Sequence, residues 1–216
     1  MIIDCIADLH GFRPKLKGGD LLIIAGDLNA RDTLKEHLEF SQWLAHQEYR
    51  KKIVIAGNHD SLMQDWAPME LDDMEYLCDS GTEFEGLKIW GAPWTPWFKG
   101  VNPNCKAFMK SDSKLSKQWD KIPMNIDILI THGPAYGILD GIPMEDGTLF
   151  HTGSQSLHAW LKDAERPRYH ICGHIHEAFG QEEYFPTYLD NMMQSINCSY
   201  VNEKYKPVNH PVRIEL

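Results

Sequence analysis

The chain has 216 residues, of which 43% are hydrophobic and 24% are charged, and its formal net charge is -10. This length suits one sizeable core and is too short to favour two domains of ordinary size, so we expect a single domain over residues 1–216. The acidic charge argues against stable binding to a nucleic-acid backbone, which needs a basic stripe, and leaves small anionic substrates open.

Five short apolar runs rich in β-branched residues are typical of central strands that are covered on both faces. They are residues 2–7, 21–25, 53–56, 126–130 and 169–172. Residues 33–46 have apolar side chains close to helical spacing, and residues 157–164 show a cleaner i, i+3, i+4, i+7 stripe. Strands that alternate with helices predict an α/β layer architecture.

The middle and the end of the chain predict strands without a helix between them. Residues 83–90 have the pattern of a hairpin across Gly86, and residues 195–201 and 212–216 predict two further strands. These segments suggest a second, mixed sheet. The proline-rich and aromatic residues 92–103 are interpreted as a structured loop.

Polar side chains able to bind metal follow each of the five apolar runs at its C-terminal end. In chain order they are Asp8 and His10, Asp27, Asn58 and His59, His132, and His174 and His176. The carboxyl ends of strands in an open α/β sheet form the crevice that binds ligands, so we expect these ends to converge. Two of the pairs are spaced i, i+2, which in extended chain turns both side chains to the same face. Glycines beside the ligands would permit tight turns and close backbone approach.

The combined ligand set indicates a metal site with two ions. Imidazole, carboxylate and amide groups without thiolate suit Mn, Fe, Zn or Mg better than a soft metal. Seven ligands are too many for one ion, but they suit two ions about 3.5–4 Å apart that share a carboxylate and clamp the oxygens of a phosphoryl displacement. Asp27 is the natural bridge. Any one of these residues alone would more often cap a turn, whereas the joint pattern favours a site.

At these residues the sequence resembles the calcineurin-like metallophosphoesterases, whose pattern is D-x-H, then G-D, then G-N-H with an acidic residue, then H, then G-H-x-H. Every element is present and in order. Residues 52–60, 91–97, 130–134 and 196–199 are similar to the metallophosphoesterase-domain-containing subgroup, which includes class III-type phosphodiesterases. The resemblance implies an α/β fold with two mixed β-sheets packed face to face and flanked by helices, a four-layer αββα sandwich.

The resemblance also implies the role of each site residue. One metal would be held by Asp8, His10, Asp27 and His176, and the other by Asp27, Asn58, His132 and His174. His59 would protonate the leaving oxygen as a general acid while a hydroxide that bridges the metals attacks. The implied activity is hydrolysis of a small phosphodiester such as a cyclic nucleotide, with manganese as the first choice of metal and Fe, Zn or Mg as alternatives.

Two alternative functions stay open. The same dinuclear core could serve a phosphomonoesterase or a nuclease, because specificity lies in the loops around it. A chain with this fold could also be a weakly active scaffold for protein interactions, although the presence of all seven ligands and His59 disfavours that hypothesis. The natural substrate and the oligomeric state are not determined by the sequence.

Three further features each have two interpretations. The aromatic residues Trp90, Trp94, Trp97 and Phe98 could stack a nucleobase, but such clusters more often pack one sheet against its neighbour. Asp60 could orient a histidine or only cap a turn. His151 could support the site from behind a ligand, but an ordinary loop histidine is the simpler interpretation.

The sequence predicts a protein without targeting or membrane segments. Its opening residues lack the basic stretch of a signal peptide, and no apolar run approaches the roughly 18 residues of a membrane span. The five cysteines are odd in number and lie mostly within apolar runs, as reduced core thiols do. We therefore expect the mature protein to start at Met1, to be cytoplasmic and to have no membrane partner.

Overall fold

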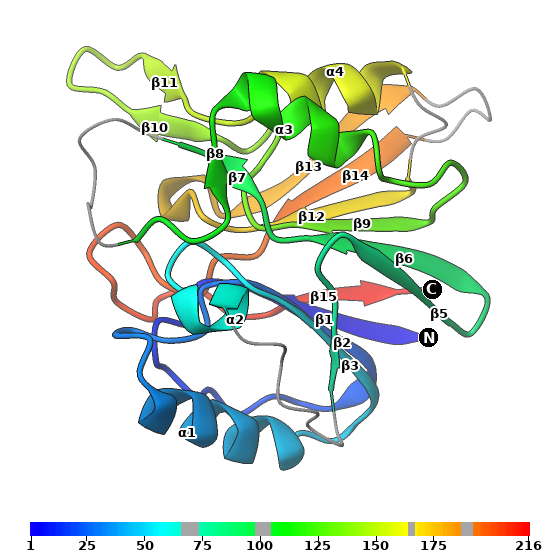
Figure 1. Ribbon diagram of the computed structural model, residues 1–216, viewed down its shortest axis with the longest axis vertical. Coiled ribbons are helices and arrows are strands. Elements are labelled where there is room, and N and C mark those ends of the chain that lie inside the picture. The colour runs from blue at the N-terminus through cyan, green and yellow to red at the C-terminus, as the bar shows by residue number, and fades with distance from the viewer. Residues whose placement is uncertain (66–73, 98–104, 164–166, 187–191) are drawn as a thin grey trace.

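Two mixed β-sheets pack face to face in the computed structural model, which describes residues 1–65, 74–97, 105–163, 167–186 and 192–216. Helix α1 (Leu34–Ala45) covers the outer face of one sheet, and helices α3 (Asp112–Trp119) and α4 (Gln155–Asp163) cover the outer face of the other (Figure 1). The layers therefore follow the order α, β, β, α, which confirms the predicted αββα sandwich.

The first sheet has five strands in the order β15-β1-β2-β3-β4. Its strands are β1 (Ile2–Ile6), β2 (Gly19–Ala25), β3 (Tyr49–Ile55), β4 (Glu75–Tyr76) and β15 (Val212–Glu215). Strands β1 to β4 are parallel, whereas β15 pairs with β1 in the antiparallel direction. The C-terminal end of the described chain thus returns to the strand with which the chain begins.

Helix α1 starts where the sequence supplies a capping box. The Thr33 side chain accepts a hydrogen bond from the backbone N–H of Glu36, and the Glu36 carboxylate accepts one from the backbone N–H of Thr33. The helix buries Phe40 and Leu44 against the outer face of the first sheet. The capping box and this apolar stripe explain why the predicted helix over residues 33–46 forms.

The second sheet has six strands in the order β13-β14-β12-β9-β6-β5. Its strands are β5 (Ser80–Phe84), β6 (Leu87–Ala92), β9 (Ile128–Thr131), β12 (Tyr169–Cys172), β13 (Gly180–Pro186) and β14 (Met192–Asn197). Strands β5 and β6 form the predicted hairpin, with Gly86 at a φ of 80° in the turn. Strands β6, β9, β12 and β14 run parallel to one another.

The remaining elements are short and lie in the connections between the strands of the two sheets. They are α2 (Ser61–Asp65), the paired strands β7 (Thr95–Pro96) and β8 (Met109–Lys110), the hairpin of β10 (Gly141–Pro143) with β11 (Leu149–His151), and the 3₁₀ helix η1 (His176–Ala178). No helix in the ranges described above is long and apolar enough to cross a membrane.

The core between the sheets consists of inward-facing apolar side chains from both layers. They include Ile3, Cys5, Ile23, Ile53 and Ile55 from the first sheet and Ile89, Ile128, Ile130, Ile171 and Ile196 from the second. All are at most 1% exposed. Because side chains alternate across a strand, their neighbours face the helices, which explains why the predicted strands are apolar throughout.

Several elements of the structure differ from the sequence predictions. Helix α3 was not predicted, because only Leu115 and Trp119 are buried apolar residues in an otherwise polar segment. Strand β13 was not predicted either. The expected loop over residues 92–103 contains β7, and its residues 98–103 lie outside the described ranges, as does Ala164 at the end of the predicted second helix.

His170 on β12 is a fully buried titratable side chain. Its Nε2 lies 2.8 Å from Thr131 Oγ1, and that hydroxyl donates to the carbonyl oxygen of Gly133 at 2.7 Å. The hydroxyl therefore accepts a hydrogen bond from the Nε2–H of a neutral ring. Burial lowers the pKa of His170 to about 4, so the folded protein keeps this imidazole uncharged at neutral pH.

We predict that His170 makes the fold sensitive to acid. In the unfolded chain a histidine has a pKa of about 6.5, so the unfolded state takes up the proton first and stability falls as the pH drops from about 6.5 through about 4. This contribution is on the order of 2 kcal/mol at pH 5. In urea unfolding of the metal-free protein, His170→Gln should narrow the difference in unfolding free energy between pH 7 and pH 5.

The exposed His46 supplies the matched control, since His46→Gln should leave that difference as it is in the unchanged protein. If His170→Gln also leaves it unchanged, burial of this ring is not the source of the acid sensitivity.

Candidate metal centre

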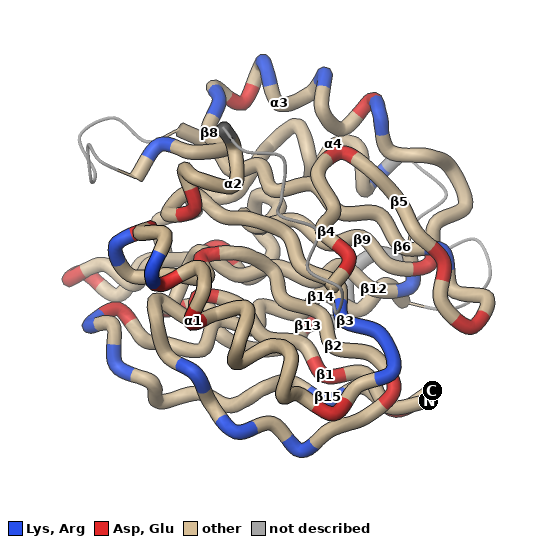
Figure 2. The backbone as a smooth tube through the Cα atoms, turned by 60° about the horizontal axis from the view of Figure 1, so that its bottom comes forward, with Lys and Arg blue, Asp and Glu red and all other residues tan. Residues whose placement is uncertain are grey.

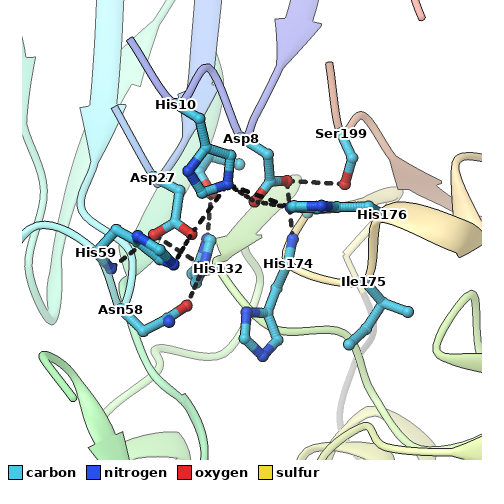
Figure 3. A network of polar contacts seen from close by, with 12 residues as sticks. Asp8, His10, Asp27, Asn58, His59, His132, His174, Ile175, His176 and Ser199 are labelled. Carbon is cyan, nitrogen blue, oxygen red and sulfur yellow. Dashed lines mark hydrogen bonds and ion pairs between the residues drawn. The ribbon is translucent and has the colours of Figure 1, made fainter. Parts of the chain in front are cut away.

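Polar side chains from both sheets meet where β1, β2, β3, β9 and β12 end (Figure 3). The structure brings together all eight residues predicted from the sequence: Asp8, His10, Asp27, Asn58, His59, His132, His174 and His176. The expected convergence of strand ends is present, but the five strands do not share one sheet. Three belong to the first sheet and two to the second, so the site lies on the seam between the two layers.

Left-handed backbone at several predicted ligands turns their side chains into the seam. The φ angles are 52° at Asp8, 40° at His10, 55° at Asp27 and 70° at His174. Such angles are uncommon for residues other than glycine and cost on the order of 1 kcal/mol or more each. The expectation that both i, i+2 pairs lie on extended chain is therefore wrong, because tight turns, and not strand alternation, direct these side chains.

Two glycines allow the backbone to pass close to the carboxylates. A Cβ at Gly57 would lie 2.2 Å from Asp27 Oδ1, and a Cβ at Gly173 would lie 2.3 Å from Asp8 Oδ2. Any side chain at either position would displace a carboxylate. These contacts confirm the close backbone approach expected from the sequence.

Asp8, His10 and His176 form the first group able to hold a cation. Nε2 of His176 lies 3.4 Å from Asp8 Oδ1 and 3.3 Å from Nε2 of His10. Asp8 Oδ1 is buried and has no hydrogen-bond partner among the residues that the structure describes. A buried carboxylate oxygen without a donor is unfavourable, so this residue set fits a metal ion that Oδ1 would coordinate.

Asp27, His132 and His174 form the second group, with Asn58 beside it. Nε2 of His132 lies 3.3 Å from Asp27 Oδ1 and 3.0 Å from Asn58 Oδ1. The other ring nitrogen of His132 is 2.9 Å from the carbonyl oxygen of Ala25, to which its N–H donates. That hydrogen bond fixes the tautomer and directs the lone pair of Nε2 into the site, an arrangement typical of metal ligands.

Asp27 lies between the two groups. Its Oδ1 faces His132, while its Oδ2 lies 3.6 Å from His10 Nε2 and 3.9 Å from His59 Nε2. The backbone N–H of His59 also donates to Oδ1 at 2.9 Å. The carboxylate is therefore placed as a bridging ligand would be.

The electrostatics of the site favour metal binding at two imidazoles. Burial lowers the pKa of His10 to about 4 and that of His174 to about 3, so both rings are in the neutral form that binds metal at pH 7. Burial would lower the pKa of His132 as well, but the charge of Asp27 raises it to about 9. A cation bound there has to displace this proton.

The two carboxylates remain ionised although both are buried. Burial alone would raise the pKa of Asp8 and Asp27, but the close approach and charge of His176 hold the pKa of Asp8 well below its usual range, and those of His132 do the same for the pKa of Asp27. Two buried negative charges thus face the seam, where bound divalent ions would compensate them.

His59 stands at the mouth of the site. Its side chain is 13% exposed, its ring meets the His10 ring edge-on at a centroid distance of 4.7 Å, and its Nδ1 lies 3.3 Å from Cys105 Sγ. The other ring nitrogen of His59, Nε2, therefore faces Asp27. This position would suit a group that exchanges a proton with a bound molecule.

Several residues around the site were not predicted individually. The Ser199 hydroxyl donates to Asp8 Oδ2 at 2.7 Å, and the Asn197 side chain donates to the carbonyl oxygen of Ile175 at 2.8 Å. Cys105 contacts His59, and the Tyr205 ring packs on His10. Cys105, Ser199 and Tyr205 lie in loops, and Asn197 is the last residue of β14. For Asn197 and Ser199 the signal in the sequence was the similarity of residues 196–199 to the subgroup.

Asp60 and His151 both have structural partners outside the ligand groups. Asp60 accepts hydrogen bonds from the backbone N–H groups of Leu28 and Gly57, so it holds the turns after β2 and β3 and orients no histidine among the described residues. His151 pairs with Asp140 at 2.6 Å and does not line the cleft at the metal site.

The described residues of the aromatic cluster also lie away from the cleft. Trp90 and Trp94 pack against the core beneath α3 and α4, which supports the structural interpretation. Trp97 is half exposed and is not among the residues that line the cleft, and Phe98 lies outside the described residues.

Comparison with known proteins identifies relatives of this fold and site. The family model described as calcineurin-like phosphoesterase matches residues 1–178. Metallophosphoesterase domain-containing protein 1 of Homo sapiens and that of Mus musculus are each 32% identical over 240 residues, which covers 98% of the chain and 70% of the relative. A UPF0046 protein of Caenorhabditis elegans is 32% identical over 82% of the chain and 69% of its own length.

A solved structure agrees at the level of the fold. The crystal structure of TT1561 of Thermus thermophilus superposes with a TM-score of 0.55 at 14% sequence identity, covering 91% of this chain and 88% of that one. The two chains therefore share a fold although their sequences differ widely.

We predict that Ser199 tunes metal affinity through Asp8. The substitution Ser199→Ala removes a hydrogen-bond donor from a buried carboxylate. We expect it to weaken metal binding about 10–100-fold, as the loss of such supporting contacts typically does. Titration of the metal-free protein with Mn²⁺, followed by calorimetry, measures the effect directly.

Ser195 on β14 is a matched control, because it is equally buried and its hydroxyl has no partner among the described residues. Ser195→Ala should bind Mn²⁺ as the unchanged protein does. Equal affinity of both variants would contradict a supporting role for Ser199.

Proposed function

Because the chain belongs to the calcineurin-like phosphoesterase family, we propose that it hydrolyses small phosphodiesters at the site on the seam between its sheets. It is a metal-dependent phosphoesterase with candidate ligand groups for a dinuclear centre. The observation that carries the proposal is the Asp27 carboxylate, whose two oxygens face different histidine groups. We take Asp8, His10, Asp27 and His176 as the ligands of one ion and Asp27, Asn58, His132 and His174 as those of the other.

The charge of the cleft supports a diester over a monoester. The cleft above the ligands has a volume of about 290 Å³, and its described lining includes the exposed Glu177 and Glu203 but no lysine or arginine. A monoester of phosphate carries close to two negative charges at neutral pH, whereas a diester carries one. Acidic side chains at the rim therefore disfavour the monoester more strongly. Lys204 Nζ lies 3.7 Å from Glu203 Oε1 at the surface and offsets part of that charge, whereas Lys204 does not line the cleft.

The charge distribution also supports a small substrate over a nucleic acid. Basic and acidic residues are interspersed along the chain, as in the segment around α3, where both blue and red positions occur (Figure 2). A nuclease that follows a phosphate backbone would need clustered lysine and arginine side chains near its site. The net charge of -10 agrees with this proposal.

The residues of this chain divide the chemistry between them. Two bound divalent ions would neutralise charge on the phosphoryl oxygens and lower the pKa of a water molecule; we propose manganese as the first choice, since the oxygen and imidazole ligands suit it. His59 donates a proton from Nε2 to the leaving oxygen. The contacts of its ring with Cys105 Sγ and His10 hold that nitrogen toward the cleft.

We predict that His59→Ala lowers kcat about 10²–10⁴-fold for a diester with an alkyl leaving group, which needs protonation. The loss should be much smaller for bis(4-nitrophenyl) phosphate, because its leaving group departs as a stable anion. Steady-state kinetics with Mn²⁺, together with metal analysis of each variant, measure both effects.

His151 is the control for this experiment, because it is a partly buried histidine outside the cleft, and His151→Ala should leave kcat unchanged. Equal losses of kcat for the two leaving groups would rule out His59 as the general acid. A higher kcat/KM for 4-nitrophenyl phosphate than for the diester would overturn the proposed preference.

A further inference from the structure

Apolar side chains from two distant parts of the chain line the cleft above the ligands. Ile142 and Phe150, which are directly paired across the β10–β11 hairpin, contribute one part of the lining, and Tyr205 from the C-terminal segment contributes another. Figure 1 shows the hairpin at the upper left and the orange-red C-terminal segment below it. The lining thus continues beyond the groups that would hold the metals.

Tyr205 is fixed in place although its side chain is half exposed. The backbone N–H of Tyr205 donates to the carbonyl oxygen of Asn202 at 2.8 Å, and the N–H groups of Lys204 and Lys206 both donate to Asn202 Oδ1 at 3.0 Å. This turn holds Tyr205 at a φ of 55°. A strained tyrosine held by a closed turn at a functional site points to a role for its ring.

The ring of Tyr205 borders the ligands themselves. Its centroid lies 4.7 Å from that of His10 and 5.2 Å from that of His176, in both cases edge-on. The residue also belongs to the cleft lining and is 48% exposed. A group attached to a phosphate at the metal site would therefore contact this ring.

Phe150 has the same character on the hairpin. It is 56% exposed although it is a large apolar residue, and it lines the cleft together with Ile142. Exposed aromatic side chains gathered at the mouth of a site are typical of ligand contacts. The acidic Glu177 and Glu203 complete the rim.

We propose that Tyr205, Phe150 and Ile142 form a subsite for an uncharged aromatic ester group next to the phosphate, with Tyr205 as a specificity-determining residue. Aromatic faces attract one another beyond simple area burial, and pairs of rings prefer offset or edge-on contact. The acidic rim disfavours ester groups that carry further negative charge. This inference rests on the proposed function, because the metal site has to hold the phosphate. The match to the family model ends at residue 178, so that model assigns Tyr205 no role.

The test uses phosphinates, which carry one negative charge, resemble a diester and cannot be hydrolysed. Calorimetric titration of the Mn²⁺-loaded protein compares methyl(phenyl)phosphinate with dimethylphosphinate, and we expect the phenyl compound to bind at least about tenfold more tightly. Tyr205→Ala should abolish this preference and Phe150→Ala should reduce it, whereas Tyr205→Phe should keep it.

Leu149 supplies the matched control on the same hairpin. Its side chain is 57% exposed, much as Phe150 is, but it does not line the cleft, so Leu149→Ala should keep the preference for the phenyl group. A carboxylate added to the phenyl ring should weaken binding, and Glu203→Gln should restore it. Because these side chains are half exposed, the variants retain the core, which thermal unfolding verifies.

The outcomes distinguish a failure of the aromatic subsite from a failure of the proposed function. If neither phosphinate binds to the metal-loaded protein, the proposed function fails and the aromatic subsite fails with it. If both bind with equal affinity, or if Tyr205→Ala keeps the preference for the phenyl compound, the subsite is wrong while the proposed function stands.

Discussion

The site depends on one buried charge, the carboxylate of Asp27. The side chain is 2% exposed, and its pKa lies well below the usual range even though burial alone would raise it. A buried anion persists only where positive groups surround it, and here histidines approach each of its oxygens. Two cations that share this carboxylate would compensate its charge more completely than partly protonated imidazoles do. Groups of potential metal ligands lie on both sides of the carboxylate, as such an arrangement requires.

The αββα sandwich positions this charge by ending strands of two sheets on one seam. The first sheet supplies Asp8, Asp27 and Asn58, and the second supplies His132 and His174. Because neither sheet carries a complete ligand set, the aliphatic core between them fixes the distances within the site. Metal binding should in turn stabilise the packing of the sheets, since ions that bind only the folded state add their binding free energy to its stability.

The central strands and the eight residues of the site were predictable because their signals are local, in apolar runs and in the polar residues that follow them. The αββα layers were implied by the family resemblance. The apolar runs could not predict that the site lies between two sheets, because the sequence of a strand does not show which other strand it pairs with. The left-handed turns at Asp8 and His174 contradicted the extended geometry assumed from spacing alone. Ser199 lies 191 residues from the Asp8 carboxylate that it supports, and only folding brings the two together.

Electron paramagnetic resonance of the protein loaded with Mn²⁺ tests the shared carboxylate most directly. Two ions that share Asp27 would lie about 3.5–4 Å apart, so we expect two Mn²⁺ per chain and an exchange-coupled spectrum that Asp27→Asn abolishes. A single Mn²⁺ per chain, or two ions with the uncoupled six-line spectrum of isolated Mn²⁺, would contradict the dinuclear centre.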